Sequence, residues 1–316
     1  MNDKGILVIG ELNIDLILNS IQGFPAIGEE ILANEFNVTM GSSSAIFASN
    51  ISILGVDTTF CGMVGRDSFG QFICEELRRK NVNTTHIVES ERYKTGITVV
   101  LNYDQNRANV TYCGAMEMFN KTNVPVHRFA DFKHLHISSY FLQKGIQKEI
   151  PNLFKLAKDN GLSTSLDIQW DPENKWKFPY QDCLPYVDVF LPNENELLML
   201  SGKPTIGEAL MLVGEFGNKI VVKQGVKGST CYESGRREFC PAFVNDHFVD
   251  AIGAGDSFNA GFILKYLSGE SVKESLRYGN LIGAISTTAS GGTTAFESLA
   301  SFQQARQLFD LTILQS

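Results

Sequence analysis

Strand-like and helix-like segments alternate along most of this 316-residue chain, and no other feature of the sequence restricts the fold as much. Six short apolar runs have the length of buried strands, and amphipathic stretches lie between them. Buried strands that alternate with helices predict a mainly parallel sheet with helices on both faces. The strand-like runs are Ile6–Ile9, Thr58–Met63, His134–Ser138, Ser163–Asp167, Val187–Leu191 and Lys219–Lys223.

Helices are predicted from apolar spacing and from the residues at their ends. The clearest examples are Phe69–Lys80 and Ile146–Lys158. Two later helices are preceded by Thr205-x-x-Glu208 and Ser271-x-x-Glu274. This spacing is typical of capping boxes, in which two side chains satisfy amides at the helix start reciprocally.

One region departs from the alternation. Gly96–Tyr103 and Ala108–Cys113 are β-rich runs joined by a polar turn at residues 104–107, which predicts an antiparallel hairpin. Together with Glu30–Met40, the hairpin is expected to form a small separate sheet. We therefore predict one domain, residues 1–316, with a β lid from about residues 12–40 and 93–114. An edge hairpin without a role remains the alternative.

Composition excludes several kinds of partner. The 35 Asp and Glu residues exceed the 27 Lys and Arg residues, which gives a net charge of −8 and disfavours binding to a phosphate backbone. No apolar run approaches the roughly 18 residues of a membrane span. The six cysteines form no C-x-x-C pair, as expected of buried thiols in a reducing compartment. We expect a cytoplasmic protein that binds neither nucleic acid nor membrane.

The residues best suited to chemistry lie in segment 249–261. Gly253 and Gly255 allow a tight turn, and the helix predicted after them would direct its free amides at a bound anion. Asp256, at the start of that helix, could accept a proton from a hydroxyl group while those amides stabilise a phosphoryl group. Helix capping by Asp256 explains its position equally well.

Other glycine motifs are absent or incomplete. No Walker A sequence and no G-x-S-x-G motif occurs in the chain. A dinucleotide fingerprint would need a small residue at position 258, where the chain has Phe258.

Segment Asp250-Ala-Ile-Gly-Ala-Gly-Asp256 resembles the D-T-x-G-A-G-D signature of the ribokinase (PfkB) family of carbohydrate kinases. Five further segments resemble motifs of that family and follow its order along nearly the whole chain. The resemblance implies a ribokinase-like three-layer α/β/α domain with a small β-sheet lid. The five segments are Gly10-Glu-Leu-Asn13-Ile-Asp15, 41–55, 62–70, 192–196 and 223–228.

The resemblance implies transfer of the γ-phosphoryl group of ATP to a hydroxyl group of a sugar or nucleoside, without a covalent nucleophile of the enzyme. Asp256 would be the general base, and the amides of Gly253, Ala254, Gly255 and Asp256 would form the anion hole. Phosphoryl transfer depends mainly on positioning and on stabilisation of charge, and such a turn supplies both.

The resemblance also assigns an acceptor site. Asn13 and Asp15 share one face of their strand, and an amide beside a carboxylate suits neighbouring sugar hydroxyls. A satisfied pair at a strand end is the alternative. The other implied pocket residues are Gly41, Ser42, Ser43 and Ile46.

Departures from the family pattern concern the acceptor. Ser42 replaces a glycine, and Ser43 stands where a lysine is frequent. Without that lysine a phosphorylated sugar is disfavoured, because a buried dianion needs Lys or Arg partners. Ile46 replaces a sugar-binding Asn, which makes ribose itself doubtful and leaves a nucleoside with an apolar base as an alternative acceptor.

The nucleotide side is also implied by the resemblance. Asn193 and Glu196, three residues apart, would hold Mg²⁺ through water, although helix capping explains them as well. Asp250 could contribute to a K⁺ site. The residues implied to contact ATP are Asn193, Lys223, Gly225, Gly228 and Asn280.

The leading hypothesis is an ATP- and Mg²⁺-dependent kinase that phosphorylates a primary hydroxyl group of a small unphosphorylated sugar. A nucleoside kinase is the second reading. A catalytically silent sugar-binding relative is the third, although such a protein has no need of Asp256. The family resemblance also implies a homodimer formed through lid strands, whose unpaired edges seek partners.

Overall fold

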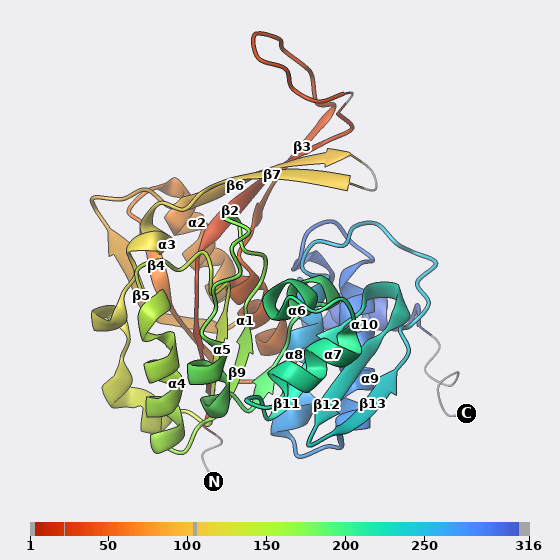
Figure 1. Ribbon diagram of the computed structural model, residues 1–316. Coiled ribbons are helices and arrows are strands. Elements are labelled where there is room, and N and C mark those ends of the chain that lie inside the picture. The colour runs from red at the N-terminus through yellow and green to blue at the C-terminus, as the bar shows by residue number, and fades with distance from the viewer. Residues whose placement is uncertain (1–3, 22, 104–105, 310–316) are drawn as a thin grey trace.

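The computed structural model of the chain describes residues 4–21, 23–103 and 106–309 (Figure 1). Within these residues a central sheet contains nine strands, and its order is β13-β12-β11-β10-β9-β8-β1-β4-β5. The strands from β11 to β5 run parallel, and only β12 and β13 are antiparallel to their neighbours. The predicted mainly parallel sheet is confirmed. In sheet order the bounds are Arg236–Cys240, Ser229–Glu233, Lys219–Lys223, Val189–Phe190, Ser163–Asp167, His134–Ser138, Ile6–Ile9, Thr58–Gly65 and Val82–Ser90.

A second, smaller sheet stands above one end of the central sheet in Figure 1. Its order is β3 (Glu35–Met40), β2 (Asn13–Asn19), β6 (Gly96–Tyr103) and β7 (Asn106–Tyr112). Strands β6 and β7 form the predicted antiparallel hairpin. Of the turn predicted at residues 104–107, the first two residues lie outside the described part, and the other two belong to β7. Strand β3 begins at Glu35, later than predicted.

Helices cover both faces of the central sheet (Figure 1). In the part of the chain that the structure describes, no helix is long and apolar enough to cross a membrane. The predicted helix Phe69–Lys80 corresponds to α2, and the predicted helix Ile146–Lys158 to α4, which begins later because residues 147–149 form a 3₁₀ turn. The helices are α1 (Ser43–Ile53), α2 (Ser68–Arg79), α3 (Ala115–Met118), α4 (Ile150–Asp159), α5 (Tyr180–Cys183), α6 (Glu194–Ser201), α7 (Ile206–Val213), α8 (Ala254–Leu267), α9 (Val272–Ser286) and α10 (Leu299–Arg306).

The two predicted capping boxes form in part. Thr205 and Ser271 each accept a hydrogen bond from the amide of the glutamate three residues later. The glutamate side chains do not complete the boxes by accepting from the backbone amides of Thr205 and Ser271. Glu208 accepts from Thr205 Oγ1 at 2.9 Å, and Glu274 pairs with Arg277 at 3.2 Å. A reciprocal capping box is present instead at the start of α6, between Asn193 and Glu196.

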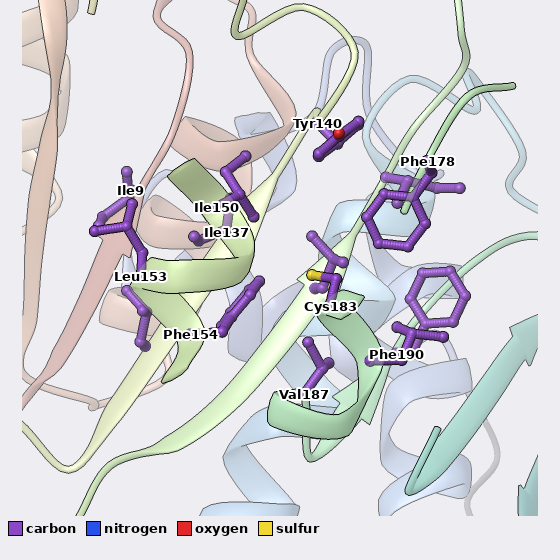
Figure 2. Packing of buried hydrophobic residues seen from close by; sticks show 14 of the residues in the cluster. Ile9, Ile137, Tyr140, Ile150, Leu153, Phe154, Phe178, Cys183, Val187 and Phe190 are labelled. Atoms are coloured by element: carbon purple, nitrogen blue, oxygen red, sulfur yellow. The ribbon is translucent and has the colours of Figure 1, made fainter. Parts of the chain in front are cut away.

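The central strands are buried on both faces, which is why helices must cover both. In β1, Leu7 and Ile9 pack into one core, and Ile6 and Val8 pack into the core on the opposite face. Figure 2 shows part of the first core, where residues of α4 such as Phe154 meet the central strands. The layered architecture thus follows from strands whose two sides are both buried.

Three strands were not predicted from the sequence, and all lie toward the edges of the central sheet. Strand β5 (Val82–Ser90) is an edge strand and has several polar, exposed residues, so it has no apolar run. Strands β12 and β13 form the hairpin at the other edge, and Arg236, Arg237 and Phe239 of β13 are exposed. Edge strands need no continuous apolar sequence, because one side meets solvent.

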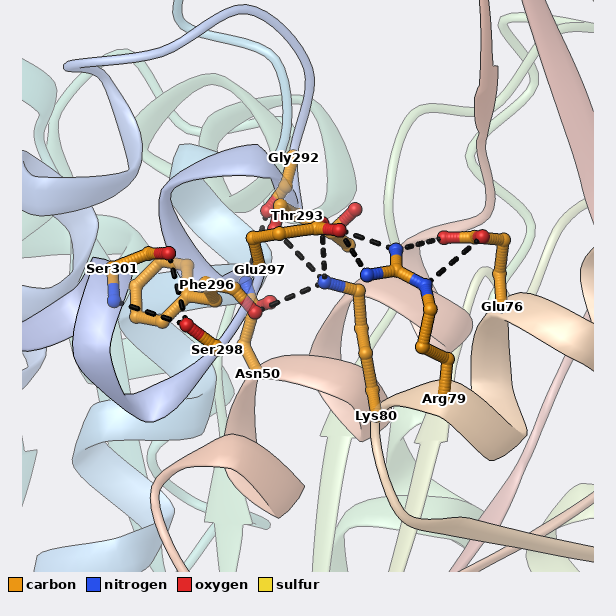
Figure 3. A network of polar contacts seen from close by, with 10 residues as sticks. All are labelled: Asn50, Glu76, Arg79, Lys80, Gly292, Thr293, Phe296, Glu297, Ser298 and Ser301. Atoms are coloured by element: carbon orange, nitrogen blue, oxygen red, sulfur yellow. Dashed lines mark hydrogen bonds and ion pairs between the residues drawn. The ribbon is translucent and has the colours of Figure 1, made fainter.

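A buried cation ties α2 to the chain segment beneath the start of α8 (Figure 3). Lys80 is fully buried and donates to Thr293 O at 3.2 Å and to Phe296 O at 2.9 Å. Its Nζ lies 3.4 Å from Glu297 Oε2. On the same segment, Gly292 O accepts from Asn50 Nδ2 at 3.0 Å. The segment at residues 292–297 is therefore fixed from both α1 and α2.

Replacement of Lys80 by methionine is expected to lower the free energy of unfolding by about 2–4 kcal/mol, because two buried carbonyl groups lose their donor. Urea denaturation followed by circular dichroism measures the change. The matched control is Lys155→Met, at an exposed position of α4, where a change within about 0.5 kcal/mol is expected. Equal stabilities of the two variants would show that the Lys80 contacts contribute nothing.

Candidate active site

A cavity of about 230 Å³ lies where the small sheet meets the central sheet. Its walls come from β2, β6 and β7 of the small sheet, from the start of α1, from the segments after β8 and β9, and from the start of α8. Seven of the predicted site residues line it. These are Asn13, Asp15, Ser42, Ser43, Ile46, Gly253 and Asp256.

Asp256 lies in the first turn of α8, at the wall of the cavity. The side chain does not cap the helix, because Gly253 occupies the N-cap position. Its Oδ1 accepts a hydrogen bond from Gln169 Nε2 at 2.9 Å. Burial, and next the charge of Asp167, raise the pKa of Asp256 to about 7, while Lys223 lowers it. A carboxyl group with this pKa can accept a proton near neutral pH.

Behind Asp256 lies a buried ion pair that the sequence did not predict. Asp167, at the end of β9, is fully buried, and its Oδ2 lies 2.5 Å from Lys223 Nζ at the end of β11. Asn259 Nδ2 donates to the same oxygen at 2.5 Å. Both charged residues end parallel strands, and polar residues at such strand ends commonly form sites in α/β folds. Its place at the end of a predicted strand is the sequence signal that could have identified Asp167 as a site residue.

Glycine is required at the turn before α8. Gly253 has a φ of 72°, and a Cβ there would lie 2.5 Å from Gly292 Cα. Ile46 packs beneath the same turn, since a Cβ at Gly253 would lie 3.2 Å from its side chain. At Gly255, by contrast, the nearest atom to an added Cβ is Lys223 Nζ at 3.6 Å. A Cβ at Gly255 would therefore make only ordinary van der Waals contact, with the Lys223 side chain.

The amides of this turn are not all available. Ala254 N, predicted to belong to the anion hole, donates to Ala251 O at 3.3 Å. In the described residues no acceptor lies within hydrogen-bond distance of the Gly255 and Asp256 amides. Such amides at a helix start, with the positive end of the helix dipole, are suited to bind an anion.

Two polar residues of β2, Asn13 and Asp15, are held together beside the cavity. Asn13 Nδ2 donates to Asp15 Oδ1 at 2.9 Å and to Thr98 Oγ1, on β6, at 3.0 Å. Gly41 lies directly against them, because a Cβ there would come within 2.2 Å of Asp15 Oδ1. Gly41 does not line the cavity; it makes room for residues that do.

Ser42 and Ser43 begin α1. Ser42 has a φ of 70°, a left-handed conformation that glycine adopts without strain, and it caps α1 by accepting from the Ala45 amide. This conformation explains why glycine is usual at that position in the family that the sequence resembles. The Ser43 hydroxyl group acts on Asp256 in the direction that lowers the pKa of the carboxyl group, although burial outweighs it.

Glu11 is a wall residue that sequence reasoning missed. Its carboxyl group is buried and accepts from Ser44 Oγ at 2.6 Å and from Ser139 Oγ at 2.9 Å. Burial raises the pKa of Glu11 above its ordinary value. The other unpredicted wall residues are Thr98, Val100, Asn109, Thr111, Ser139, Leu142, Gln169, Trp170 and Ile252.

Asn193 and Glu196 form the reciprocal capping box of α6. Both oxygens of Glu196 accept hydrogen bonds from Asn193, from its amide at 2.8 Å and from Nδ2 at 2.7 Å. Burial, and next the charge of Asp167, raise the pKa of Glu196 to about 8. The capping alternative is thus realised in the structure, and any bound water would use the remaining lone pairs of these oxygens.

The other residues predicted to contact ATP have different environments. Lys223 is paired with Asp167, as described above. Asn280 is buried and donates to Cys240 O and Pro241 O at 3.0 Å each, so its amide holds the end of β13. A Cβ at Gly228 would lie 2.1 Å from Cys240 O, whereas the space around Gly225 is open. In the described residues nothing fills the space beside Gly225, and the ATP contacts of this set stay predictions.

Asp250 joins two loops near the start of α8. Its Oδ1 accepts from the Ile252 amide at 2.7 Å, and its Oδ2 accepts from the Gly291 amide at 3.1 Å. Among the described residues, no three His, Cys, Asp or Glu side chains are arranged to bind a metal ion directly.

The family model for pfkB family carbohydrate kinases matches residues 3–299. The chain belongs to this family. It is therefore a phosphotransferase whose acceptor is an alcohol group. The kinase is 26% identical to ribokinase of Bacillus subtilis over 291 residues, which cover 91% of this chain and 94% of that protein.

Solved structures share the fold of the kinase. Adenosine kinase from Sinorhizobium meliloti has a TM-score of 0.83 at 22% identity, with 96% of this chain and 99% of that chain covered. A putative ribokinase II from E. coli, solved in complex with ATP and Mg²⁺, has a TM-score of 0.83 at 23% identity and the same coverage. The predicted ribokinase-like fold is confirmed.

Proposed function

We propose that this kinase transfers the γ-phosphoryl group of ATP to a hydroxyl group, preferably primary, of a small unphosphorylated sugar or sugar derivative. The observation that carries the proposal is the position of Asp256. Its carboxyl group lies at the cavity wall and at the start of α8, with a pKa near 7. A base for the acceptor and amides for the phosphoryl group are thereby placed side by side.

The polarity of the cavity supports an uncharged acceptor. Asn13, Asp15 and Thr98 offer the mixture of donors and acceptors that sugar hydroxyls require. Among the described residues, no Lys or Arg lines the cavity. A phosphorylated sugar would enter a site with carboxyl groups and no cationic partner, which is unfavourable.

In the proposed mechanism, Asp256 accepts the proton of the attacking hydroxyl group as its oxygen forms the new bond to the γ-phosphorus and the bond from that phosphorus to ADP breaks, releasing ADP. The amides of Gly255 and Asp256 stabilise the negative charge on the transferred group, with the helix dipole acting in the same direction. When bound, ATP supplies the phosphoryl group, and Mg²⁺ offsets its charge.

The residues around the nucleotide side fit Mg²⁺ held through water. Asp167, Glu196 and Asp256 are three carboxyl groups near the single ammonium of Lys223, and their mutual repulsion contributes to the raised pKa values of Glu196 and Asp256. A hydrated divalent cation favours such surroundings and needs few direct protein ligands. Glu196 and Asn193 would orient its water, and Asp250, whose oxygens keep unused lone pairs, would contribute to a K⁺ site.

We further propose that the small sheet, from about residues 12–40 and 93–114, acts as a lid that excludes water from the cavity. Its two edge strands carry exposed apolar side chains, among them Phe36 and Val38 on β3 and Val110 and Tyr112 on β7. Exposed edges of this kind favour pairing with a second copy, so the proposal includes a cytoplasmic homodimer formed through lid strands.

A nucleoside is the second candidate acceptor. Trp170 lines the cavity with 52% of its surface exposed, and Leu142 and Ile252 are apolar neighbours in the wall. An indole ring in this position can stack on a nucleobase or on the apolar face of a sugar ring. The structural similarity to an adenosine kinase fits this candidate.

A coupled assay of ADP release over ketoses, aldoses, sugar acids and nucleosides tests the proposed function. Turnover with a neutral sugar would support the first candidate, and turnover only with nucleosides would support the second. Absence of turnover with every compound would contradict the proposal and favour a silent sugar-binding relative.

Replacement of Asp15 by alanine is expected to weaken acceptor binding by about 10²-fold or more while ATP affinity stays within about twofold, because only the acceptor contacts β2. Trp170 lies in the cavity wall, so quenching of tryptophan fluorescence measures acceptor binding. Equal loss of ATP and acceptor binding would indicate misfolding, and unchanged acceptor binding would contradict the assignment of Asp15.

A further inference from the structure

The side-chain amide of Gln169 lies between two carboxylates. Gln169 Nε2 is 2.9 Å from Asp256 Oδ1 and 3.2 Å from Asp167 Oδ2. One amide nitrogen carries two protons, so it can donate to both carboxylates at once. Gln169 therefore connects the proposed base to the buried Asp167–Lys223 ion pair.

The loop that presents Gln169 is unusually constrained. Gln169, Asn174 and Trp176 all have φ between 52° and 59°, the left-handed region that residues other than glycine rarely adopt. The buried carboxylate of Asp171 holds this backbone by accepting from the amides of residues 173, 175 and 176 at 2.7–2.9 Å. Backbone strain of this kind persists where a site requires one geometry.

We propose that Gln169 is a positioning residue for phosphoryl transfer: it holds Oδ1 of Asp256 so that Oδ2 remains directed at the acceptor hydroxyl group. This inference rests on the proposed function, in which Asp256 is the base. With Oδ1 held, the carboxylate of Asp256 cannot rotate freely. It is therefore already oriented for proton transfer when the acceptor binds.

The Gln169 amide carries no charge, and this affects the pKa of Asp256. A Lys or Arg donor would orient the carboxylate equally well, but its charge would lower the pKa of Asp256 and make it a weaker base. The ammonium of Lys223 instead contacts Asp167 directly, at 2.5 Å. The other charged groups that act on this region are the carboxyl groups of Glu11 and Glu196. Gln169 thus orients Asp256 without adding a charge.

The test compares Gln169→Leu and Gln169→Glu with the wild type, using the acceptor that gives the highest turnover in the ADP-release assay. Gln169→Leu is expected to lower kcat about 10–100-fold with KM for ATP unchanged, and to move the rise of kcat with pH to higher pH. Gln169→Glu should retain more of the wild-type rate at pH 6 than at pH 8, because only a protonated glutamate can donate to Asp256.

The matched control is Gln147→Leu. Gln147 Nε2 also donates a partly buried hydrogen bond, to Tyr140 O at 3.1 Å, but lies outside the cavity wall. Its kcat and pH profile should equal those of the wild type. A Gln169→Leu variant with kcat within twofold of wild type and the same pH profile would overturn the inference.

A second measurement needs no acceptor. In protein labelled at aspartate ¹³Cγ, the Asp256 resonance is identified as the one missing from Asp256→Asn, and its titration is followed by NMR. Loss of the Gln169 hydrogen bond should raise the titration midpoint by about one pH unit in Gln169→Leu, and Gln147→Leu should leave it unchanged. An unchanged midpoint in Gln169→Leu would overturn the inference about Gln169, whether or not the wild type transfers a phosphoryl group. Absence of phosphoryl transfer by the wild type would separately refute the proposed function.

Discussion

Replacement of Asp256 by asparagine is expected to lower kcat by about 10²–10⁴-fold, with a much smaller effect on KM for ATP, because the amide cannot accept the acceptor proton. In the wild type the pKa of Asp256 is raised to about 7. Activity should therefore fall about tenfold per pH unit below pH 7 and level off above it. This rise with pH should be absent from Asp256→Asn.

The control for this variant is Asp159→Asn, at an exposed position at the end of α4, which should keep wild-type kcat. The kcat of the wild type and of both variants is determined from initial rates of ADP release between pH 5 and 9. If Asp256→Asn kept turnover within tenfold of wild type, the assignment of Asp256 as the base would be wrong.

The same variant should be more stable than the wild type at high pH. The folded-state pKa of Asp256 is raised, mainly by burial, above the ordinary value of 3.8 for an aspartate. The stability that the protonated carboxyl group contributes is fully present below about pH 4 and is lost as the pH rises through 7. Asparagine does not ionise, so Asp256→Asn should gain on the order of 2–4 kcal/mol relative to wild type between pH 4 and 8, measured by urea denaturation.

Replacement of Lys223 by methionine is expected to lower the free energy of unfolding by about 3–5 kcal/mol, because it leaves the fully buried carboxylate of Asp167 without its cation. The double variant Lys223→Met, Asp167→Leu should recover most of that loss, since an apolar pair replaces two buried charges. Urea denaturation of the single and double variants measures both effects.

Lys227→Met is the control for Lys223→Met. Lys227 pairs with Glu194 at 3.3 Å, but its side chain is 66% exposed, so its loss should cost at most about 1 kcal/mol. A Lys223→Met variant as stable as Lys227→Met would contradict the importance of the buried pair. So would a double variant that is no more stable than Lys223→Met alone.

The sequence predicted the parts of the site that belong to one continuous segment. Asn13 and Asp15 lie two residues apart on a strand, and the turn at Gly253 immediately precedes Asp256, so local geometry relates them. The sequence did not indicate the backbone partners of Asn280 and Ala254, whose roles at the ATP site and in the anion hole stay predictions. In a sequence, a small or polar residue that contacts a ligand cannot be distinguished from one that binds neighbouring backbone. The carbonyl groups that Asn280 and Ala254 contact belong to residues 240, 241 and 251, and only the fold shows that they lie close.

The sequence by itself determined the class of fold. Strands that are buried on both faces must be covered by helices on both faces, and the β-rich hairpin outside the alternation predicted a separate sheet. It also determined the Gly253–Asp256 turn, since a glycine and a carboxylate before a helix are recognised locally.

Only the tertiary structure decided what surrounds Asp256. Gln169 is 87 residues from Asp256, Lys223 is 56 residues from Asp167, and Ser139 is 128 residues from Glu11. Hydrophobic periodicity and turn motifs report only local conformation. The order and register of the parallel strands determine which strand ends meet, and with them the burial and charge that raise the pKa of Asp256 to about 7.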